Sequence, residues 1–462
     1  MTRWAAVVVP AALLYFVPLP GFDPVQQHLL AMFVGTIIAL AAQPIPMGAS
    51  VLLAMTLLVL TKTLSPARAL AGFSIQQVWM IFSAFIFARA MMLTGLGQRV
   101  AYILISTFGK NSLALGYCLA ATNLVIAPFV PSDTGRGGGL IYPIARSLAA
   151  AFDSEPGPTA NRIGAFLMLV GFHSTYLTSA MFLTSMVANP VIAQFALKIA
   201  HVDLSWVRWA EAACVPGGVA LVVIPWLIYR WNPPEVRDTA PARALAKSEL
   251  ERLGPFSRNE RWLAAILIAV VIGWVTSPWH PVPNAFVALS GLCAMIIFRV
   301  LSWDALLDER RAWDALLWFG PLLMMADELV KTGVVSMLSK QVFGHIQGWP
   351  WAAGVTALVV IYLYVHYGFA SMTAQATALY PGFLTAALAT GAPAFIAVMP
   401  LGHFSNLNAC LTHYGTGSAP VFFGPGYVTQ SAWWRLGFLI SLANLTIWFG
   451  LGVIWWKVLG LW

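Results

Sequence analysis

Long apolar runs, broken at intervals by short polar stretches, dominate the hydropathy pattern of this chain. The runs that predict membrane-spanning helices lie near residues 3–19, 27–45, 76–95, 207–229, 262–277, 284–301, 312–332, 351–368 and 432–459. The run 49–62 is shorter than the roughly 20 residues that a span needs, so we expect a tilted or half-inserted helix there. With the polar-interrupted runs between residues 101 and 201, this pattern predicts an all-α polytopic membrane protein of about 11 transmembrane helices.

Two of the polar stretches are similar to each other. Residues 131–143 read PSDTGRGGGLIYP and residues 370–381 read ASMTAQATALYP, so both contain Ser-x-Thr and later Leu and Tyr-Pro. A second polar insertion follows each stretch, at residues 171–190 and 402–420. Two halves with two breaks each predict an inverted internal repeat around one central polar site.

These breaks predict non-helical backbone at membrane depth. Such backbone is tolerated only where protein buries it or where it lines a cavity, because hydrocarbon offers no hydrogen-bond partners. We therefore expect two re-entrant hairpins and two discontinuous helices whose tips meet near the bilayer midplane. The tips bring together helix N-termini, hydroxyl groups and glycines, which are suited to binding carboxylates.

The most hydrophilic segment, Arg230 to Arg261, lies close to the middle of the chain and is rich in Arg and Lys. Cytoplasmic loops carry such an excess of positive charge, so we expect a cytoplasmic linker between the two repeats. Residues 151–162 are predicted to form a loop, and residues 302–312 a loop or an interfacial helix.

Composition supports a membrane location and gives no sign of a cofactor. The chain is 60% hydrophobic and 9% charged, whereas soluble domains are about 25% charged. The net charge of +8 fits positive cytoplasmic loops better than nucleic-acid binding, for which no motif is present. Its four cysteines form no Cys-x-x-Cys pair, and no His-x-x-x-His pattern occurs, so neither a metal nor a cofactor is predicted.

Arg136 is the most informative single residue of the first polar stretch. A charge at bilayer depth costs roughly 2.5–3.5 kcal/mol on insertion scales, so such residues are usually paired and functional. Two compatible roles stay open: a local ion pair with Asp133, and a fixed positive charge for an anionic substrate. Packing of small residues explains single Ser or Thr positions, but packing requires neither an Asp nor an Arg.

The paired stretches resemble the hairpin tips of the divalent anion/sodium symporter family, the dicarboxylate and citrate carriers. The family hallmark is Ser-Asn-Thr at each tip, and the matching positions here read Ser132-Asp133-Thr134 and Ser371-Met372-Thr373. Residues 178–184 and 405–428 are similar to one branch, which contains bacterial citrate, tartrate and succinate antiporters and plastid 2-oxoglutarate/malate translocators. The resemblance covers nearly the whole chain.

This resemblance implies a homodimer in a bacterial inner membrane, with a transport domain that moves like an elevator against a scaffold domain in each protomer. It places the scaffold in residues 1–112 and 262–355, the transport domain in residues 113–230 and 356–462, and a cytoplasmic linker in residues 231–261. The residues expected to contact substrate are Ser132, Asp133, Thr134, Arg136, Gly137, Ser179, Thr184, Ser371, Met372, Thr373, Gln375, His413, Thr416, Gly417 and Ser418.

Two departures from the family motif favour exchange over sodium-coupled uptake. Sodium-coupled members use the Asn of each motif near their sodium sites, whereas this chain has Asp133 and Met372. Met offers no hard oxygen ligand, and a site with the fixed charge of Arg136 is costly to move empty. The predicted function is therefore sodium-independent antiport of carboxylates such as 2-oxoglutarate, malate, succinate, tartrate or citrate.

Three alternatives compete with this function. A sodium- or proton-coupled symporter of the same anions or of sulfate is the nearest. A channel is disfavoured because hairpins in an internal repeat imply alternating access. A membrane-embedded enzyme that uses Asp133 and a histidine as acid and base is the most remote, and we expect no enzymatic activity.

Overall fold

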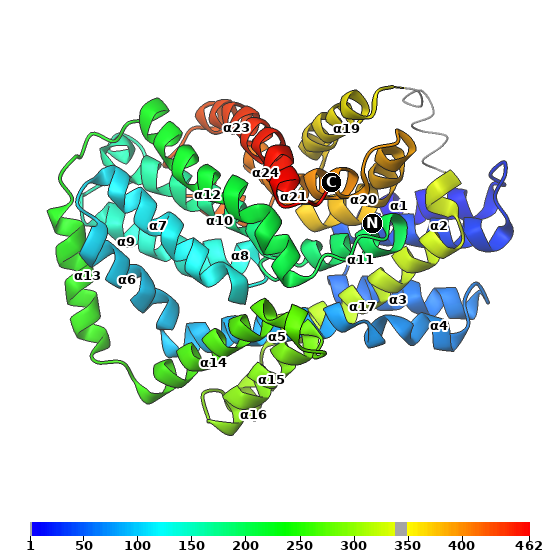
Figure 1. The fold of residues 1–462 in the computed structure, drawn as a ribbon, viewed down its shortest axis with the longest axis horizontal. Helices are drawn as coiled ribbons and strands as arrows, with labels where there is room; N and C mark the ends of the chain where they lie inside the picture. Colours follow the sequence, from blue (N-terminus) through cyan, green and yellow to red (C-terminus); the bar gives the residue numbers. More distant parts are fainter. Residues whose placement is uncertain (1, 338–348) are drawn as a thin grey trace.

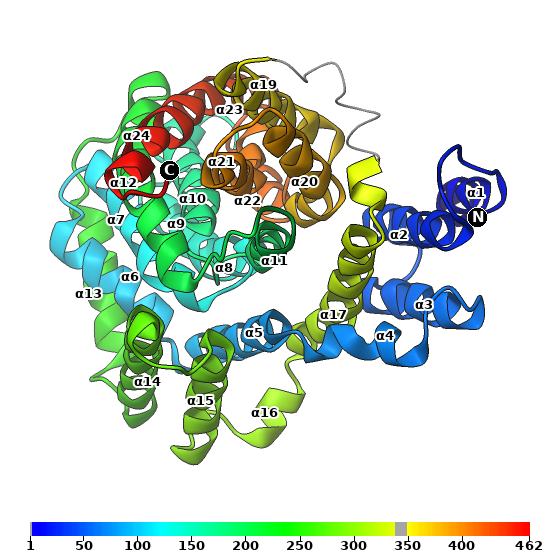
Figure 2. The ribbon, with the colours of Figure 1, turned by 45° about the vertical axis from the view of Figure 1, so that its right-hand side comes forward.

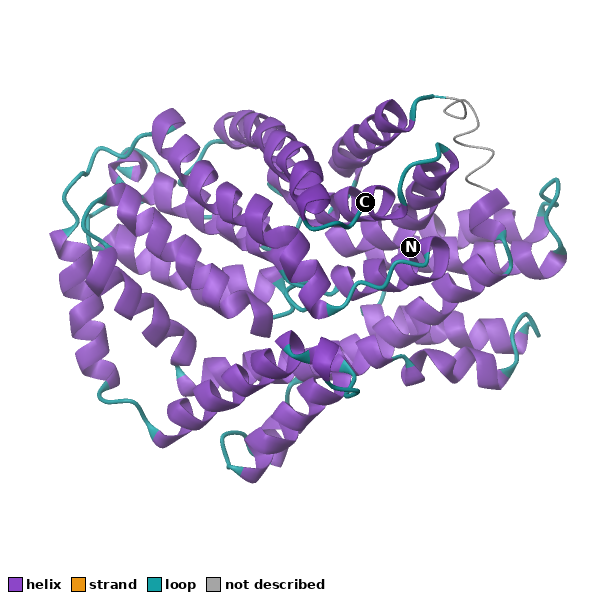
Figure 3. Cartoon of the chain, in the orientation of Figure 1, coloured by secondary structure: helices purple, strands orange, loops and turns teal. Residues whose placement is uncertain are grey.

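The computed structural model describes residues 2–337 and 349–462 of the chain (Figure 1). Helices and their connections make up this described part, which contains no strand and one isolated bridge between Asn111 and Asp238 (Figure 3). Six of the described helices are long and apolar enough to cross a membrane. The prediction of an all-α membrane protein is thus confirmed, while the number of spans stays a prediction.

One group of helices, which we call the outer helices, lies along the lower and right side of the molecule in Figure 2. Among them, α3 has only 14 residues and is therefore about 21 Å long, which agrees with the short run predicted near it. The outer helices are α1 (Thr2–Phe16), α2 (Pro24–Ala42), α3 (Met47–Leu60), α4 (Pro66–Leu70), α5 (Gln76–Thr94), α14 (Arg258–Val275), α15 (Asn284–Ile297), α16 (Trp303–Leu307) and α17 (Arg310–Lys331).

The remaining large group forms a rounded bundle above the outer helices in Figure 2, which we call the hairpin bundle. Large side chains such as Trp209, Trp433 and Tyr176 fill its interior. Its helices are α7 (Ser112–Ile126), α8 (Asp133–Arg136), α9 (Tyr142–Ala150), α10 (Gly164–Met181), α11 (Ala188–Ala200), α12 (Trp206–Trp231), α19 (Trp351–Tyr364), α20 (Met372–Ala389), α21 (Ala394–Leu407), α22 (Ala419–Phe423), α23 (Gln430–Asn444) and α24 (Gly452–Val458).

The predicted breaks are present in this bundle. The chain reverses between α7 and α8 to form hairpin 1 (residues 112–150), and between α19 and α20 to form hairpin 2 (residues 351–389). The polar insertions separate α10 from α11, which we call break 1 (residues 182–187), and α21 from α22, which we call break 2 (residues 408–418). The predicted repeat of two hairpins and two discontinuous helices is therefore confirmed, while its inverted orientation stays a prediction.

The two hairpins differ by one residue, and a π-helical turn accommodates the difference. Pro143 follows the tip residue Ser132 by eleven positions, whereas Pro381 follows Ser371 by ten. Residues Gly137–Ile141 form a π-helix in hairpin 1, and a π-turn contains one residue more than an α-turn. The glycines of this stretch therefore lie in the π-helical turn that accommodates the extra residue.

The hydrophilic linker contains a helix that its sequence did not predict. Helix α13 (Ala240–Leu253) packs along α6 (Leu96–Phe108) at the left edge of Figure 1. Arg99 of α6 is 4% exposed; its Nε donates to Glu260 at 2.5 Å, and its Nη1 donates to the carbonyl of Gly254 at 2.8 Å. A buried charge with these partners fixes the end of the linker beside the first turn of α14.

Candidate substrate-binding site

A serine caps the helix that begins at each hairpin tip. The Ser132 hydroxyl accepts a hydrogen bond from Gly135 N–H at 3.0 Å, and the Ser371 hydroxyl accepts one from Ala374 N–H at 3.3 Å. The first amides of a helix have no acceptor within the helix, and its N-terminus carries a partial positive charge. The repeat therefore supplies two equivalent electropositive helix ends.

The carboxylate of Asp133 joins the tip of hairpin 1 to break 2. It accepts a short hydrogen bond from the Thr416 hydroxyl and another at 2.9 Å from the Ser418 hydroxyl. Asp133 is only 7% exposed, so these two hydroxyls replace the water that a carboxylate needs. Asp133 is thereby brought into contact with two predicted site residues that lie 283 and 285 positions away in the sequence.

Two glycines allow the close approach of hairpin 1 and break 2. A Cβ atom at Gly417 would overlap the hydroxyl of Thr134. A Cβ atom at Gly137 would lie 3.1 Å from the Thr175 methyl group and 3.2 Å from the Cβ of Ser418. Both positions were predicted as site residues, and their role here is to admit neighbouring elements.

We expect Gly417→Ala to reduce transport at least tenfold, because the added methyl group displaces Thr134 from the tip. Overpacking of this kind costs about 1–3 kcal/mol, so the variant should still fold. Gly139→Ala is the matched control, since a Cβ atom at Gly139 meets nothing within 4 Å. Uptake by proteoliposomes checks this, and an unimpaired Gly417→Ala variant would refute the close approach.

Arg136 lies in a cradle of protein oxygens and is 0% exposed. Its Nη1 donates to the carbonyls of Val130 at 2.8 Å and Ser185 at 3.2 Å. Its Nη2 donates to the carbonyl of Thr175 at 2.8 Å and to the Ser179 hydroxyl at 2.6 Å. Each terminal nitrogen is thus fully engaged by the protein, and Arg136 ties hairpin 1 to break 1.

No ion pair joins Arg136 to Asp133 within the described ranges of the chain. The two side chains instead bind opposite neighbours, because Asp133 bonds to break 2 and Arg136 to break 1. Of the two roles left open by the sequence, the local ion pair is thus not observed. Direct contact between Arg136 and a substrate stays a prediction.

Break 1 is held by hydroxyl and amide side chains. The predicted residue Thr184 donates to the carbonyl of Pro128 in hairpin 1 at 2.6 Å and accepts from Trp206 Nε1 at 3.1 Å. Asn189 donates to the carbonyl of Ser179 at 2.8 Å and accepts from Asn406 Nδ2, also at 2.8 Å. The pair Asn189–Asn406 therefore connects the discontinuous helices of the two repeats.

In hairpin 2, Gln375 occupies the position that corresponds to Arg136, four residues after the capping serine. It is 0% exposed, its Nε2 donates to the carbonyl of Tyr362 at 2.7 Å, and its Oε1 accepts from Asn408 Nδ2 at 3.0 Å. The same oxygen lies 2.5 Å from His366 Nδ1, and His366 Nε2 lies 2.9 Å from the carbonyl of Gly415. Break 2 therefore touches both hairpins through adjacent residues.

Solvent exposure divides the predicted residues into two sets. Ser132, Thr134, Ser371, Thr373 and Gly417 are exposed or half-buried and offer groups to a ligand. The buried set frames the tips and consists of Asp133, Arg136, Gly137, Ser179, Thr184, Met372, Gln375, Thr416 and Ser418.

The half-buried His413 differs from both sets, because it accepts from Trp434 Nε1 at 3.0 Å in an aromatic cluster. The sequence reasoning also missed Asn189, Asn406 and Asn408, although an Asn at a helix break is a usable signal. No group of three or more His, Cys, Asp or Glu side chains suited to a metal occurs in the described part of the chain.

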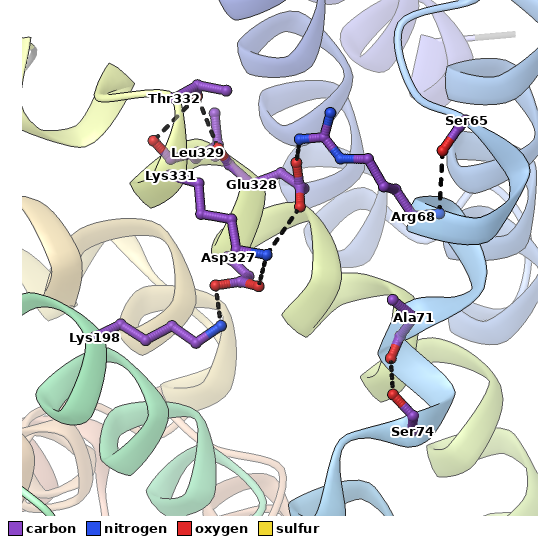
Figure 4. A network of polar contacts seen from close by, with 10 residues as sticks. All are labelled: Ser65, Arg68, Ala71, Ser74, Lys198, Asp327, Glu328, Leu329, Lys331 and Thr332. Carbon is purple, nitrogen blue, oxygen red and sulfur yellow. Dashed lines mark hydrogen bonds and ion pairs between the residues drawn. The ribbon is translucent and has the colours of Figure 1, made fainter.

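A network of charges connects the hairpin bundle to the outer helices (Figure 4). Lys198 of α11 forms a short ion pair with Asp327 of α17. Asp327 also pairs with Lys331 at 2.8 Å, and Glu328 pairs with Arg68 of α4. Of these five residues, Lys198 is the one that belongs to the hairpin bundle.

Comparison with known proteins agrees with this architecture. Residues 1–462 match the sodium:sulfate symporter transmembrane region. YflS of Bacillus subtilis (strain 168) is 42% identical over 98% of this chain and 96% of its own length. Dicarboxylate transporter 1, chloroplastic, of Arabidopsis thaliana is 41% identical over 99% of this chain and 83% of its own. The L-tartrate/succinate antiporter of Shigella sonnei (strain Ss046) is 30% identical over 99% of this chain and 98% of its own length.

A solved structure supports the fold by shape. The YdaH transporter of Alcanivorax borkumensis superposes with a TM-score of 0.57 at 15% identity, over 88% of this chain and 89% of that one. At this identity the likeness concerns the fold alone. The match over all 462 residues and the relatives above 30% identity decide the family. The chain belongs to the sodium:sulfate symporter family, that is, the divalent anion/sodium symporter family that its hairpin motifs resemble.

Proposed function

We propose that this protein is a sodium-independent antiporter that exchanges di- or tricarboxylates across a bacterial inner membrane. One observation carries the proposal: the repeat presents two serine-capped helix ends, at Ser132 and Ser371, with accessible hydroxyls beside them. Each end is equivalent to about half a positive charge. Two such ends suit a molecule with a carboxylate at each end.

The relatives favour the same substrate class and favour transport over catalysis. Their names describe a chloroplast dicarboxylate transporter and a tartrate/succinate antiporter. 2-Oxoglutarate, malate, succinate, tartrate and citrate all carry the two carboxylates that the paired tips suit.

The surroundings of Arg136 support exchange without sodium. Carbonyl and hydroxyl oxygens, such as those of Val130, Thr175 and Ser179, are ligands that hard cations prefer. Here a guanidinium takes all of these oxygens. In hairpin 2, Met372 supplies no oxygen at the tip. We infer that this tethered cation takes the place of the ion that sodium-coupled members of the family use.

The charge of the empty site favours obligatory exchange. Arg136 and Asp133 lie on one helical turn and cancel, which leaves the two helix ends and a net charge of about +1. Moving this charge through the membrane without an anion is costly. A bound dicarboxylate offsets it, so the loaded carrier crosses more readily than the empty one.

The proposal includes an elevator movement in a homodimer. The hairpin bundle would be the transport domain (residues 113–230 and 356–462), and the outer helices would belong to the scaffold (residues 1–112 and 262–355). The ion pair between Lys198 and Asp327 crosses the boundary between these two parts, so the movement requires it to break and form again.

Exchange should proceed at an unchanged rate when sodium is replaced by potassium or choline at constant pH. The reason is that the guanidinium of Arg136 already binds oxygen atoms that a sodium ion would need at hairpin 1. Proteoliposomes loaded with unlabelled succinate, malate, 2-oxoglutarate, tartrate or citrate would be tested for uptake of the same labelled acid. A steep dependence on sodium would restore the symporter, and the absence of exchange with every acid would refute the carboxylate assignment.

A further inference from the structure

A small cavity lies between hairpin 1 and the outer helices, beside the tip just described. Hairpin 1 contributes Ser132 and Gly135 to its lining, α5 contributes Met92, and the start of α17 contributes Glu309 and Arg311. The cavity therefore places charged residues of the outer helices next to the tip that is proposed to bind a carboxylate.

The guanidinium of Arg311 reaches this tip. A Cβ atom at Gly135 would lie 3.8 Å from Arg311 Nη1. This distance is an ordinary van der Waals contact, so the guanidinium lies directly beside the tip. Gly135 is the residue whose amide donates to the capping hydroxyl of Ser132. The approach is close enough for one carboxylate to contact both the helix end and Arg311.

The charge of Arg311 is not neutralised within the described part of the protein. Arg311 is exposed, and its side chain takes part in no ion pair or hydrogen bond there. The neighbouring residue Glu309 is 8% exposed, and its carboxylate lies 3.7 Å from Nε of Arg89 in α5. Glu309 and Arg311 are the two charged residues in the cavity lining. Because Arg89 balances Glu309, the positive charge of Arg311 remains.

We propose that Arg311 is a substrate-binding residue of the outer helices that grips the carboxylate held at the tip of hairpin 1. This inference rests on the proposed function and extends it to a residue outside the hairpins and breaks. Arginine presents a planar fork that binds a carboxylate through two parallel hydrogen bonds. Serine-capped amides approach the carboxylate from hairpin 1, and Arg311 approaches it from the facing side.

The position of Arg311 makes this contact specific to one conformation. The hairpin bundle carries the tip, whereas α17 belongs to the outer helices. When the bundle moves, the tip leaves Arg311 behind, so the added affinity exists only in the state described here. The substrate is then held more tightly on one side of the membrane than on the other.

The test is the exchange of labelled succinate and malate by Arg311→Gln in proteoliposomes. A charge-assisted hydrogen bond corresponds to at least a tenfold change in affinity, so we expect KM to rise about tenfold with an unchanged maximal rate. Arg311→Lys should recover part of this loss, because lysine keeps the charge but not the fork. Arg310→Gln is the matched control, since Arg310 is also exposed and does not line the cavity.

Each outcome decides between specific ideas. A KM within twofold of the wild type in Arg311→Gln would overturn the inference and leave Arg311 as a surface residue of the bilayer interface. A lower maximal rate with unchanged KM would also overturn it, because that result indicates a role in movement. Failure of the wild-type protein to exchange either acid or any other carboxylate would count against the proposed function itself.

Discussion

Arg136→Ala is expected to abolish exchange, and Arg136→Lys to leave it severely impaired, while both variants still fold. The guanidinium donates to three carbonyls and one hydroxyl from two nitrogens, whereas lysine offers three donors from a single point. A charge-assisted hydrogen bond contributes roughly 1.5–3 kcal/mol, so the loss of several should lower the exchange rate at least a hundredfold. Counterflow with purified, monodisperse protein measures the effect.

The double variant Asp133→Asn with Arg136→Gln separates two explanations of that loss. If Arg136 served only to neutralise Asp133, removing both charges would restore exchange. The structure predicts no recovery, because Asp133 bonds to Thr416 and Ser418 while Arg136 bonds to carbonyls of other segments. Full recovery in the double variant would therefore remove Arg136 from the functional site.

Cross-linking position 198 to position 327 is expected to stop exchange completely and reversibly. Lys198→Cys and Asp327→Cys would be combined in a chain whose exposed cysteines are replaced by Cys214→Ser and Cys293→Ser. A short reducible linker between the two thiols joins the hairpin bundle to α17 and blocks the proposed movement. Exchange should return when the linker is reduced.

The variant should be active before cross-linking. The double replacement removes a neutral pair, so the net charge of the network is unchanged. Glu328 still pairs with Arg68 and lies 3.3 Å from Lys331. The control link joins Gln26→Cys to Thr332→Cys, two positions that are in contact within the outer helices. This control should keep full exchange when cross-linked. Undiminished exchange by the fully cross-linked 198–327 protein would show that the bundle does not move against α17.

The sequence predicted the hairpins and breaks well, for a clear physical reason. Glycine, proline and hydroxyl residues inside apolar runs violate the rule that hydrocarbon favours unbroken helices, so their positions are visible without a structure. The tips at Ser132 and Ser371 and the two discontinuous helices follow from this contrast. The capping role of each serine was not predicted, although a serine before a helix is a strong N-cap.

The partners of the charged residues were not predictable. Arg136 bonds mainly to backbone carbonyls, and every residue has one, so the sequence does not mark which carbonyls will surround it. Asp133 finds Thr416 at a separation of 283 residues. Lys198 and Asp327 come together only when the bundle is packed against α17. Helix α13 was not predicted, because its own sequence pattern does not indicate a helix. Its apolar face is buried only by packing against α6.

The tethering of Arg136 has a consequence for energy coupling. Moving one elementary charge through a membrane potential of 100 mV involves about 2.3 kcal/mol, and a carrier that takes up sodium ions with its anion gains from that potential. In the proposed elevator movement, a guanidinium fixed to the chain would cross in both directions of the cycle, so its contribution would cancel over a complete turnover. When one dianion is exchanged for another, the potential therefore performs no net work. The two concentration ratios alone decide which acid enters and which leaves.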